Sequence, residues 1–189
     1  MTEMTAAKDR MSDTAFRMMA PAFKIADFFS PRTGKLDDFG IKEGFIVIDY
    51  GRGPGRYIPE ASKLAGTSGK VYAVDIHELV IKSVRDVIKK RNLQNVETIQ
   101  ISDYRTPLPD NTAHIIYALD MFHGISQPDR LQGEWRRLLR PDGQLVLEDG
   151  HQLRKTTKKK IADAGFFIVY TEKKEHLICK PKKNDFSGS

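Results

Sequence analysis

The fold of this chain is decided by residues 45–55, which read Phe45-Ile46-Val47-Ile48-Asp49-Tyr50-Gly51-Arg52-Gly53-Pro54-Gly55. The apolar run has no polar alternation, so it predicts a strand that is buried on both faces, as in a parallel sheet. The three glycines at alternate positions predict a tight turn whose bare backbone lets a ligand approach closely. A helical pattern follows, and the whole stretch therefore has the strand–turn–helix context of a nucleotide site.

Length and composition favour one ordinary globular domain. The chain has 189 residues, of which 40% are hydrophobic and 30% charged, and this size suits a single core. Its only cysteine, Cys179, excludes an internal disulfide and a cysteine-cluster metal site. The sequence shows no transmembrane segment, and residues 1–13 lack the apolar core of a signal peptide. We therefore expect a cytoplasmic protein.

Strand and helix patterns alternate along the chain. We expect residues 1–12 to be disordered, residues 13–181 to form a single domain that opens with a helical cap over 13–43, and residues 182–189 to form a tail. The expected strands are 45–50, 70–75, 96–101, 113–119 and 144–148, with Arg140 to Gly143 as a turn, and the expected helices are 57–64, 78–91, 128–139 and 154–163. Residues 166–171 and 176–180 predict an antiparallel hairpin. The order predicts an α/β, Rossmann-like open sheet of seven mostly parallel strands with a terminal antiparallel hairpin and helices on both faces.

Polar side chains gather where the predicted strands end. Parallel strands share one carboxyl edge, where such sheets bind ligands. Asp75 ends the second strand and is suited to accept both hydroxyls of a ribose. The spacing Gly51-x-Gly53-x-Gly55, with arginine at position 56, does not match the dinucleotide pattern G-x-G-x-x-G. A carboxylate at Asp49 also disfavours a pyrophosphate and suits a ligand with an ammonium group and a ribose, such as S-adenosylmethionine (SAM).

Five motifs in this order resemble the class I SAM-dependent methyltransferases, and within them the small relatives of the ubiquinone/menaquinone biosynthesis methyltransferases. The resemblance covers roughly residues 30–181 and rests on Val47 to Gly55, Val71 to Ile76, Asn95 to Asp103, Ile115 to His123, and Arg137 to Leu145. It implies that 13–181 is a SAM-dependent methyltransferase domain. Arg52 and Asp142 depart from the family pattern, and Arg52 stands in the middle of the glycine turn.

The resemblance also implies a set of cofactor-binding residues. Those implied at the methionine end of SAM are Asp49, Gly51, Gly53, Gly55, Leu119 and Asp120. At the adenosine end, Asp75 is implied to bind the ribose and Ile76 to pack on the adenine. Asp103 is implied to accept from the adenine amino group, with Tyr104 flanking the ring.

Two histidines are candidates for a catalytic base. Methyl transfer is an in-line displacement that needs a base only if the acceptor carries a proton. His123 and His151 follow the fourth and fifth strands, on the expected substrate side, whereas His77 and His114 are expected at the surface. Asp120, Asp149 and His151 could together bind a divalent metal, as in catechol-type relatives. Nothing in their spacing requires a metal, and none is expected.

The sequence leaves the class of methyl acceptor undecided. The Asn/Asp-Pro-Pro-aromatic motif of DNA amino-methylating relatives is absent after the fourth strand, and no cysteine lies near the site. We expect a methyltransferase that acts on a small or lipid-like acceptor. The basic segment from His151 to Lys183 keeps a protein or RNA methyltransferase as an alternative, and a non-catalytic SAM-binding protein is a third. The expected site is open, and the apolar segment 16–29, with Arg32, or a second subunit in a homodimer could complete it.

Overall fold

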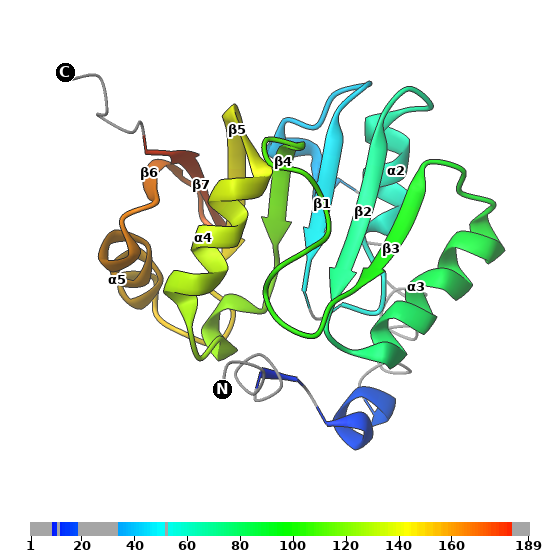
Figure 1. Ribbon diagram of the computed structural model, residues 1–189, viewed down its shortest axis with the longest axis horizontal. Coiled ribbons are helices and arrows are strands. Elements are labelled where there is room, and N and C mark those ends of the chain that lie inside the picture. Colours follow the sequence, from blue (N-terminus) through cyan, green and yellow to red (C-terminus); the bar gives the residue numbers. More distant parts are fainter. Residues whose placement is uncertain (1–8, 11, 19–33, 52, 183–189) are drawn as a thin grey trace.

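The computed structural model of the chain describes residues 9–10, 12–18, 34–51 and 53–182. Within these residues, seven strands form one sheet in the order β3-β2-β1-β4-β5-β7-β6 (Figure 1). The strands that run parallel are β1 (Ile46–Tyr50), β2 (Lys70–Asp75), β3 (Val96–Gln100), β4 (Ala113–Ala118) and β5 (Leu139–Glu148). β6 (Phe167–Glu172) and β7 (His176–Pro181) form the antiparallel hairpin, and β7 pairs with β5. The predicted fold class is confirmed.

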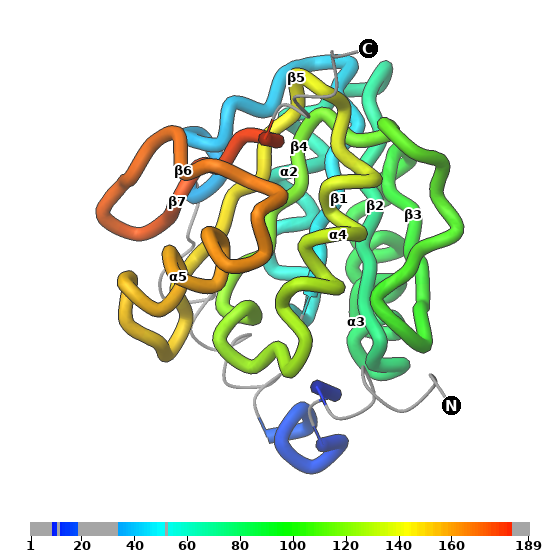
Figure 2. The backbone as a smooth tube through the Cα atoms, turned by 60° about the vertical axis from the view of Figure 1, so that its left-hand side comes forward, coloured from blue at the N-terminus to red at the C-terminus, as the bar shows by residue number. Residues whose placement is uncertain are grey.

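Helices cover both faces of the sheet. Helices α2 (Ile58–Ala65) and α3 (Glu78–Arg91) lie on one face, and α4 (Pro128–Leu138) and α5 (Arg154–Ala164) lie on the other (Figures 1 and 2). Neighbouring residues of β1 therefore enter different cores. Val47 packs in the cluster that contains Ile58 of α2, whereas Ile48 packs in the cluster that contains Trp135 of α4. This two-sided burial is the physical reason for the unbroken apolar run of β1.

One predicted turn is part of a strand. Strand β5 begins at Leu139 rather than near residue 144, because Ala113 already pairs with Leu139. The register shifts between Ala113 and Ile115, and Ile115 pairs with Gln144. The Arg140 to Gly143 stretch is thus an irregular start of β5, and the turn predicted there is wrong.

Before residue 34 the structure describes two short pieces, residues 9–10 and 12–18, which together are called the N-terminal segment. Residues 13–18 are helical, and η2 (Asp37–Phe39) is a single 3-10 turn. In Figure 1 the blue segment lies beyond the carboxyl ends of the parallel strands, where their arrowheads are drawn. Most of the predicted lid, 16–29, lies outside the described residues, as do Arg32 and Arg52. None of the described helices has the length and apolar character that crossing a membrane requires.

Candidate active site

A small cavity lies at the carboxyl edge of the parallel strands. Its volume is about 30 Å³, and the residues around it come from the ends of β1 and β2, the segments that follow β1, β2, β3 and β4, and the N-terminal segment. The lining residues are Asp9, Tyr50, Gly51, Val74, Asp75, Ile76, Ile101, Tyr104, Met121 and Ile125. Gly51, Asp75, Ile76 and Tyr104, all singled out from the sequence, are therefore brought together here.

Gly51 is the glycine of the turn that reaches this cavity. Its φ is +124°, a conformation that favours glycine, and a Cβ added to it would lie 2.6 Å from Cγ of Met121. Gly55, at φ +86°, lies against Val84 of α3, 3.1 Å from the position of an added Cβ. Gly53 does not line the cavity and donates its N–H to the carbonyl oxygen of Gly51 at 2.8 Å. The three glycines thus have different neighbours, and Gly55 serves the packing of the turn on α3.

Asp75 is held by the start of the next helix. Its side chain is 5% exposed, and Oδ1 accepts the backbone N–H of His77 at 2.7 Å. His77 Nδ1 in turn accepts the N–H of Leu79 at 3.1 Å and caps α3. The prediction that His77 lies at the surface is wrong, because its ring packs against Phe16, with the ring centroids 5.3 Å apart. His114 is partly exposed.

Asp49 lies beside the cavity without lining it. Burial of its carboxyl group raises its pKa to about 7. The Tyr117 hydroxyl acts in the opposite direction, and the negative charge of Asp75 adds to the rise. At neutral pH this carboxyl group is therefore poised between its neutral and ionised forms, and a cation nearby would ionise it.

Two other residues implied by the resemblance have different neighbours. Asp103 Oδ2 accepts from Arg130 Nη2 at 2.7 Å. Leu119 packs in the hydrophobic cluster that contains Ile58 of α2. Met121, rather than Leu119, is the residue that a Cβ on Gly51 would contact. The sequence did not single out Met121.

The N-terminal segment contributes a carboxylate to the cavity. Asp9 is 4% exposed, and both of its carboxylate oxygens lie 3.1 Å from the N–H of Ser126. The hydroxyl of Tyr104 also donates to Asp9, and the hydroxyl of Tyr50 donates to the carbonyl oxygen of Tyr104. Burial, together with Asp9, raises the pKa of Tyr104 to about 12. Sequence reasoning missed Asp9, because it lies in a polar stretch that has no periodic pattern.

The two candidate histidines meet Asp120 next to this cavity. Oδ1 of Asp120 lies 3.8 Å from Nδ1 of His123 and 3.9 Å from Nε2 of His151. The two imidazole rings are edge to face, with their centroids 5.0 Å apart. Asp149, which the sequence grouped with Asp120 and His151, instead accepts from Nε of Arg154 at 2.6 Å.

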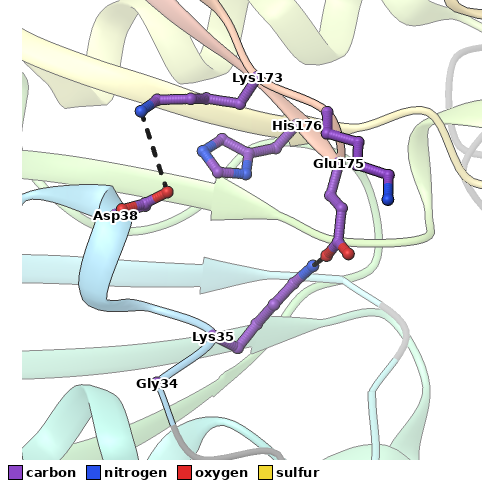
Figure 3. Close-up of a pocket in the computed structure, with 7 residues that line it drawn as sticks. Gly34, Lys35, Asp38, Lys173, Glu175 and His176 are labelled. Carbon is purple, nitrogen blue, oxygen red and sulfur yellow. Dashed lines mark hydrogen bonds and ion pairs between the residues drawn. The ribbon is translucent and has the colours of Figure 1, made fainter.

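A second, larger hollow of about 630 Å³ contains none of the predicted site residues (Figure 3). Four of its charged groups pair with one another or with a neighbouring strand. Lys35 Nζ lies 2.5 Å from Glu148 and 2.6 Å from Glu175, and Lys173 lies 4.0 Å from Asp38. These ion pairs tie the turn between β6 and β7 to residues 34–38, which is a structural role.

Comparisons with known proteins agree on one family. A family model described as a methyltransferase domain matches residues 48–147. The ubiquinone/menaquinone biosynthesis C-methyltransferase UbiE of Escherichia coli strain K12 is 32% identical over 115 residues, which cover 59% of this chain. They cover 45% of that relative, so the chain spans about half the length of the curated relatives it matches.

Solved structures show the same fold. A SAM-dependent methyltransferase from Aquifex aeolicus is 30% identical with a TM-score of 0.69, and the match covers 76% of this chain and 86% of that one. A type 11 methyltransferase from Sulfolobus solfataricus, described as putative, is 24% identical with a TM-score of 0.62 over 84% of this chain and 95% of that one. The second likeness supports the fold alone.

Proposed function

The chain belongs to the methyltransferase domain family, and on that premise we propose that it binds SAM and transfers the methyl group to a small or lipid-like acceptor. The family was predicted from the sequence motifs, and that prediction is confirmed. The observation that carries the proposal is the meeting of Gly51 and Asp75 in one cavity at the carboxyl ends of β1 and β2. This is the place where open α/β sheets bind nucleotide-like ligands.

Each part of SAM has matching groups in the chain. The carboxylate of Asp75 accepts the ribose hydroxyls, and Ile76 and Tyr104 flank the adenine. The bare backbone of Gly51 approaches the methionine end, with Gly53 and Gly55 shaping the turn. Asp103 accepts a hydrogen bond from the adenine amino group after its ion pair with Arg130 breaks. Asp120 lies beside the methionine moiety.

The cavity must open before SAM enters. Its volume of about 30 Å³ is roughly a tenth of the smallest usual ligand pocket, which measures about 300 Å³. Asp9 of the N-terminal segment and Met121 both line it, and Met121 lies against Gly51. We therefore assign the described part of this segment a gating role, in which it withdraws as SAM binds.

Asp49 suits the ammonium group of SAM. A cation brought near its carboxyl group favours the ionised form and lowers the pKa from its value of about 7. Binding of SAM then releases a proton when the pH is below that value. The Tyr117 hydroxyl favours the ionised form of this carboxyl group and so acts with the ammonium group.

The chemistry requires positioning and one proton acceptor at most. The acceptor atom attacks the sulfonium methyl in line with the sulfur, the carbon–sulfur bond breaks, and its electron pair stays on the sulfur. Where the acceptor carries a proton, His123 takes it, with Asp120 beside the imidazole to stabilise the charged form. His151, which is 82% exposed, is the second candidate and lies nearer to solvent.

A small or lipid-like acceptor is favoured over RNA by the charges of helix α5. Two of its lysines are paired, Lys158 with Glu172 at 2.9 Å and Lys159 with Asp163 at 2.7 Å. These pairs offset the positive charge that a phosphate backbone would need. The name of the Escherichia coli relative refers to quinone biosynthesis, which supports testing hydroxylated aromatic acceptors first.

A transfer assay with methyl-labelled SAM tests the proposal. We expect label to move to a hydroxylated aromatic or lipid-like acceptor, and Asp75→Asn to reduce this transfer at least about tenfold. Asp86→Asn is the matched control, because Asp86 is exposed on α3 and pairs with Lys82 one turn away. Binding of SAM without transfer to any acceptor would instead support a non-catalytic SAM-binding protein.

A further inference from the structure

We propose that Asp120, His123 and His151 form a binding site for a divalent transition-metal ion. The three residues offer one ligand atom each, and these atoms lie within 4.8 Å of one another. The sequence raised a metal at Asp120, Asp149 and His151 as an alternative, although none was expected. It grouped Asp120 and His151 with Asp149, whereas the fold replaces Asp149 with a second imidazole.

The ligand atoms lie slightly farther apart than they would around a bound ion, so the site must contract a little when the ion binds. Zinc bonds of about 2.0–2.1 Å place tetrahedral ligand atoms about 3.3 Å apart. The observed distances from Asp120 Oδ1 are 3.8 Å and 3.9 Å, so contractions of well under an ångström are needed there. His151 is 82% exposed, and its ring is able to turn toward the other two ligands without disturbing the core.

The backbone of the two loops brings the ligands together. Gly150 has φ +61°, and a Cβ added to it would lie 2.2 Å from Nδ1 of His123 and 2.9 Å from Oδ1 of Asp120. Glycine at this position therefore lets the loop after β5 pass directly over the loop after β4. Among the described residues, Asp120 is one of three non-glycine residues at positive φ, at +50°, a conformation that costs free energy and is found often at functional sites.

The donor set selects the class of ion. Two imidazoles and one carboxylate suit zinc, cobalt, iron or nickel, whereas magnesium and calcium prefer oxygen ligands throughout. Three protein ligands leave positions open, which is the arrangement of catalytic metal sites. Lys160 donates to the carbonyl oxygens of Phe122 at 3.1 Å and His123 at 3.4 Å, and these bonds hold the turn that carries His123.

The place of the site suggests its use, and this step rests on the proposed function. Met121 and Ile125, which line the cofactor cavity, flank His123 in the chain. An acceptor with a phenolic or enolic oxygen fills an open position, and the metal lowers the pKa of that oxygen. The proton leaves to solvent, the resulting anion attacks the methyl group, and the sulfonium becomes a neutral thioether. His123 then binds the ion instead of accepting the proton.

Cobalt is the probe that reports both binding and ligand type. The tag-free full chain, freed of metal by a chelator, is titrated with Co²⁺ while its visible absorption is recorded. We expect one equivalent to bind with visible bands, Zn²⁺ to displace it, and excess Mg²⁺ to leave it in place.

His151→Ala, His123→Ala and Asp120→Asn should each weaken binding at least about tenfold. His114→Gln is the control, because His114 lies at the other end of β4 and accepts from Ile46 N at 3.0 Å.

The decisive variant is His151→Ala, because so exposed a side chain is not needed for folding. Undiminished Co²⁺ affinity in this variant, or no Co²⁺ uptake by the wild type, overturns the metal site. Calorimetry with S-adenosylhomocysteine on the same metal-free sample separates the two proposals. Binding of that ligand without Co²⁺ uptake leaves the proposed function standing and removes the metal site alone.

Discussion

The hydroxyl of Tyr104 donates a hydrogen bond to the carboxylate of Asp9, 95 residues earlier in the chain. Tyr104 follows β3 at the cofactor cavity, and Asp9 belongs to the N-terminal segment, so this bond fastens the segment across the cavity. Phe16 provides a second point of attachment by packing against His77 at the start of α3. The position of this segment at the cavity therefore depends on a few identifiable contacts.

Weakening these contacts should improve cofactor binding. A bond to a charged group contributes about 1.5–3 kcal/mol, and the closed segment lowers the apparent affinity by the fraction of time it is closed. Asp9→Asn should therefore bind S-adenosylhomocysteine about tenfold more tightly in a calorimetric titration, and Phe16→Ala should act in the same direction. Weaker binding by Asp9→Asn, with Asp86→Asn unchanged, would mean that Asp9 assists the cofactor instead of blocking it.

The affinity for SAM should rise with pH up to about 7. Asp49 has a pKa of about 7, above its usual value, so it is mostly neutral at lower pH and must lose a proton to pair with the ammonium of SAM. Affinity should fall about tenfold per pH unit below that value and level off above it. Titrations in buffers of different ionisation enthalpy should show about one proton released per SAM at about pH 6. Asp49→Asn should bind weakly and show no such release, and a pH-independent wild type would contradict this role.

Gly51→Ala should damage both stability and binding. The added Cβ meets Met121 at 2.6 Å and the residue keeps a φ of +124°, so we expect a loss of about 2–4 kcal/mol in the free energy of unfolding and no detectable binding of S-adenosylhomocysteine. Gly53→Ala is a matched control in the same turn, because the nearest described atom to its Cβ outside its chain neighbours would be the nitrogen of Gly55, at 4.0 Å. Equal losses in the two variants, measured by urea unfolding, would refute the argument.

The loop that carries Tyr104 depends on a buried ion pair. Glu134 is 7% exposed and lies 2.7 Å from Arg137, and its Oε1 also accepts the N–H and hydroxyl of Thr106 at 2.8 and 2.9 Å. Glu134→Gln removes one charge of this pair and should cost about 3 kcal/mol of unfolding free energy. Glu97→Gln, which breaks an exposed pair with Lys70, should cost under about 1 kcal/mol. Chemical denaturation of both variants makes the comparison.

The sheet could be predicted because each strand has a local signal. The apolar run of β1 and the carboxylate that ends β2 can be recognised from adjacent residues alone, without knowing which strands lie beside them. Gly51 and Asp75 were found for the same reason, since each belongs to a motif of adjacent residues. The irregular start of β5 could not be predicted, because it depends on the pairing of Leu139 with Ala113 in another strand.

The rest of the site depends on contacts between distant segments. Asp149 and His151 both follow β5, but only the fold shows that Arg154 binds Asp149 and that His123 approaches Asp120. Likewise, Asp9 stands in a polar stretch that predicts disorder, and a single carboxylate gives no local sign that it will be buried against Tyr104. Such residues become visible only when the loops at the carboxyl edge are seen together.

Calorimetric titration of the full chain with S-adenosylhomocysteine tests the central claim most directly. The account predicts one binding site per chain, with affinity reduced at least about tenfold in Asp75→Asn, where the amide oxygen still accepts from His77 but the charge is lost. Asp86→Asn should match the wild type. No binding heat with the wild type, or equal affinity in Asp75→Asn, would contradict the assignment of this cavity to SAM.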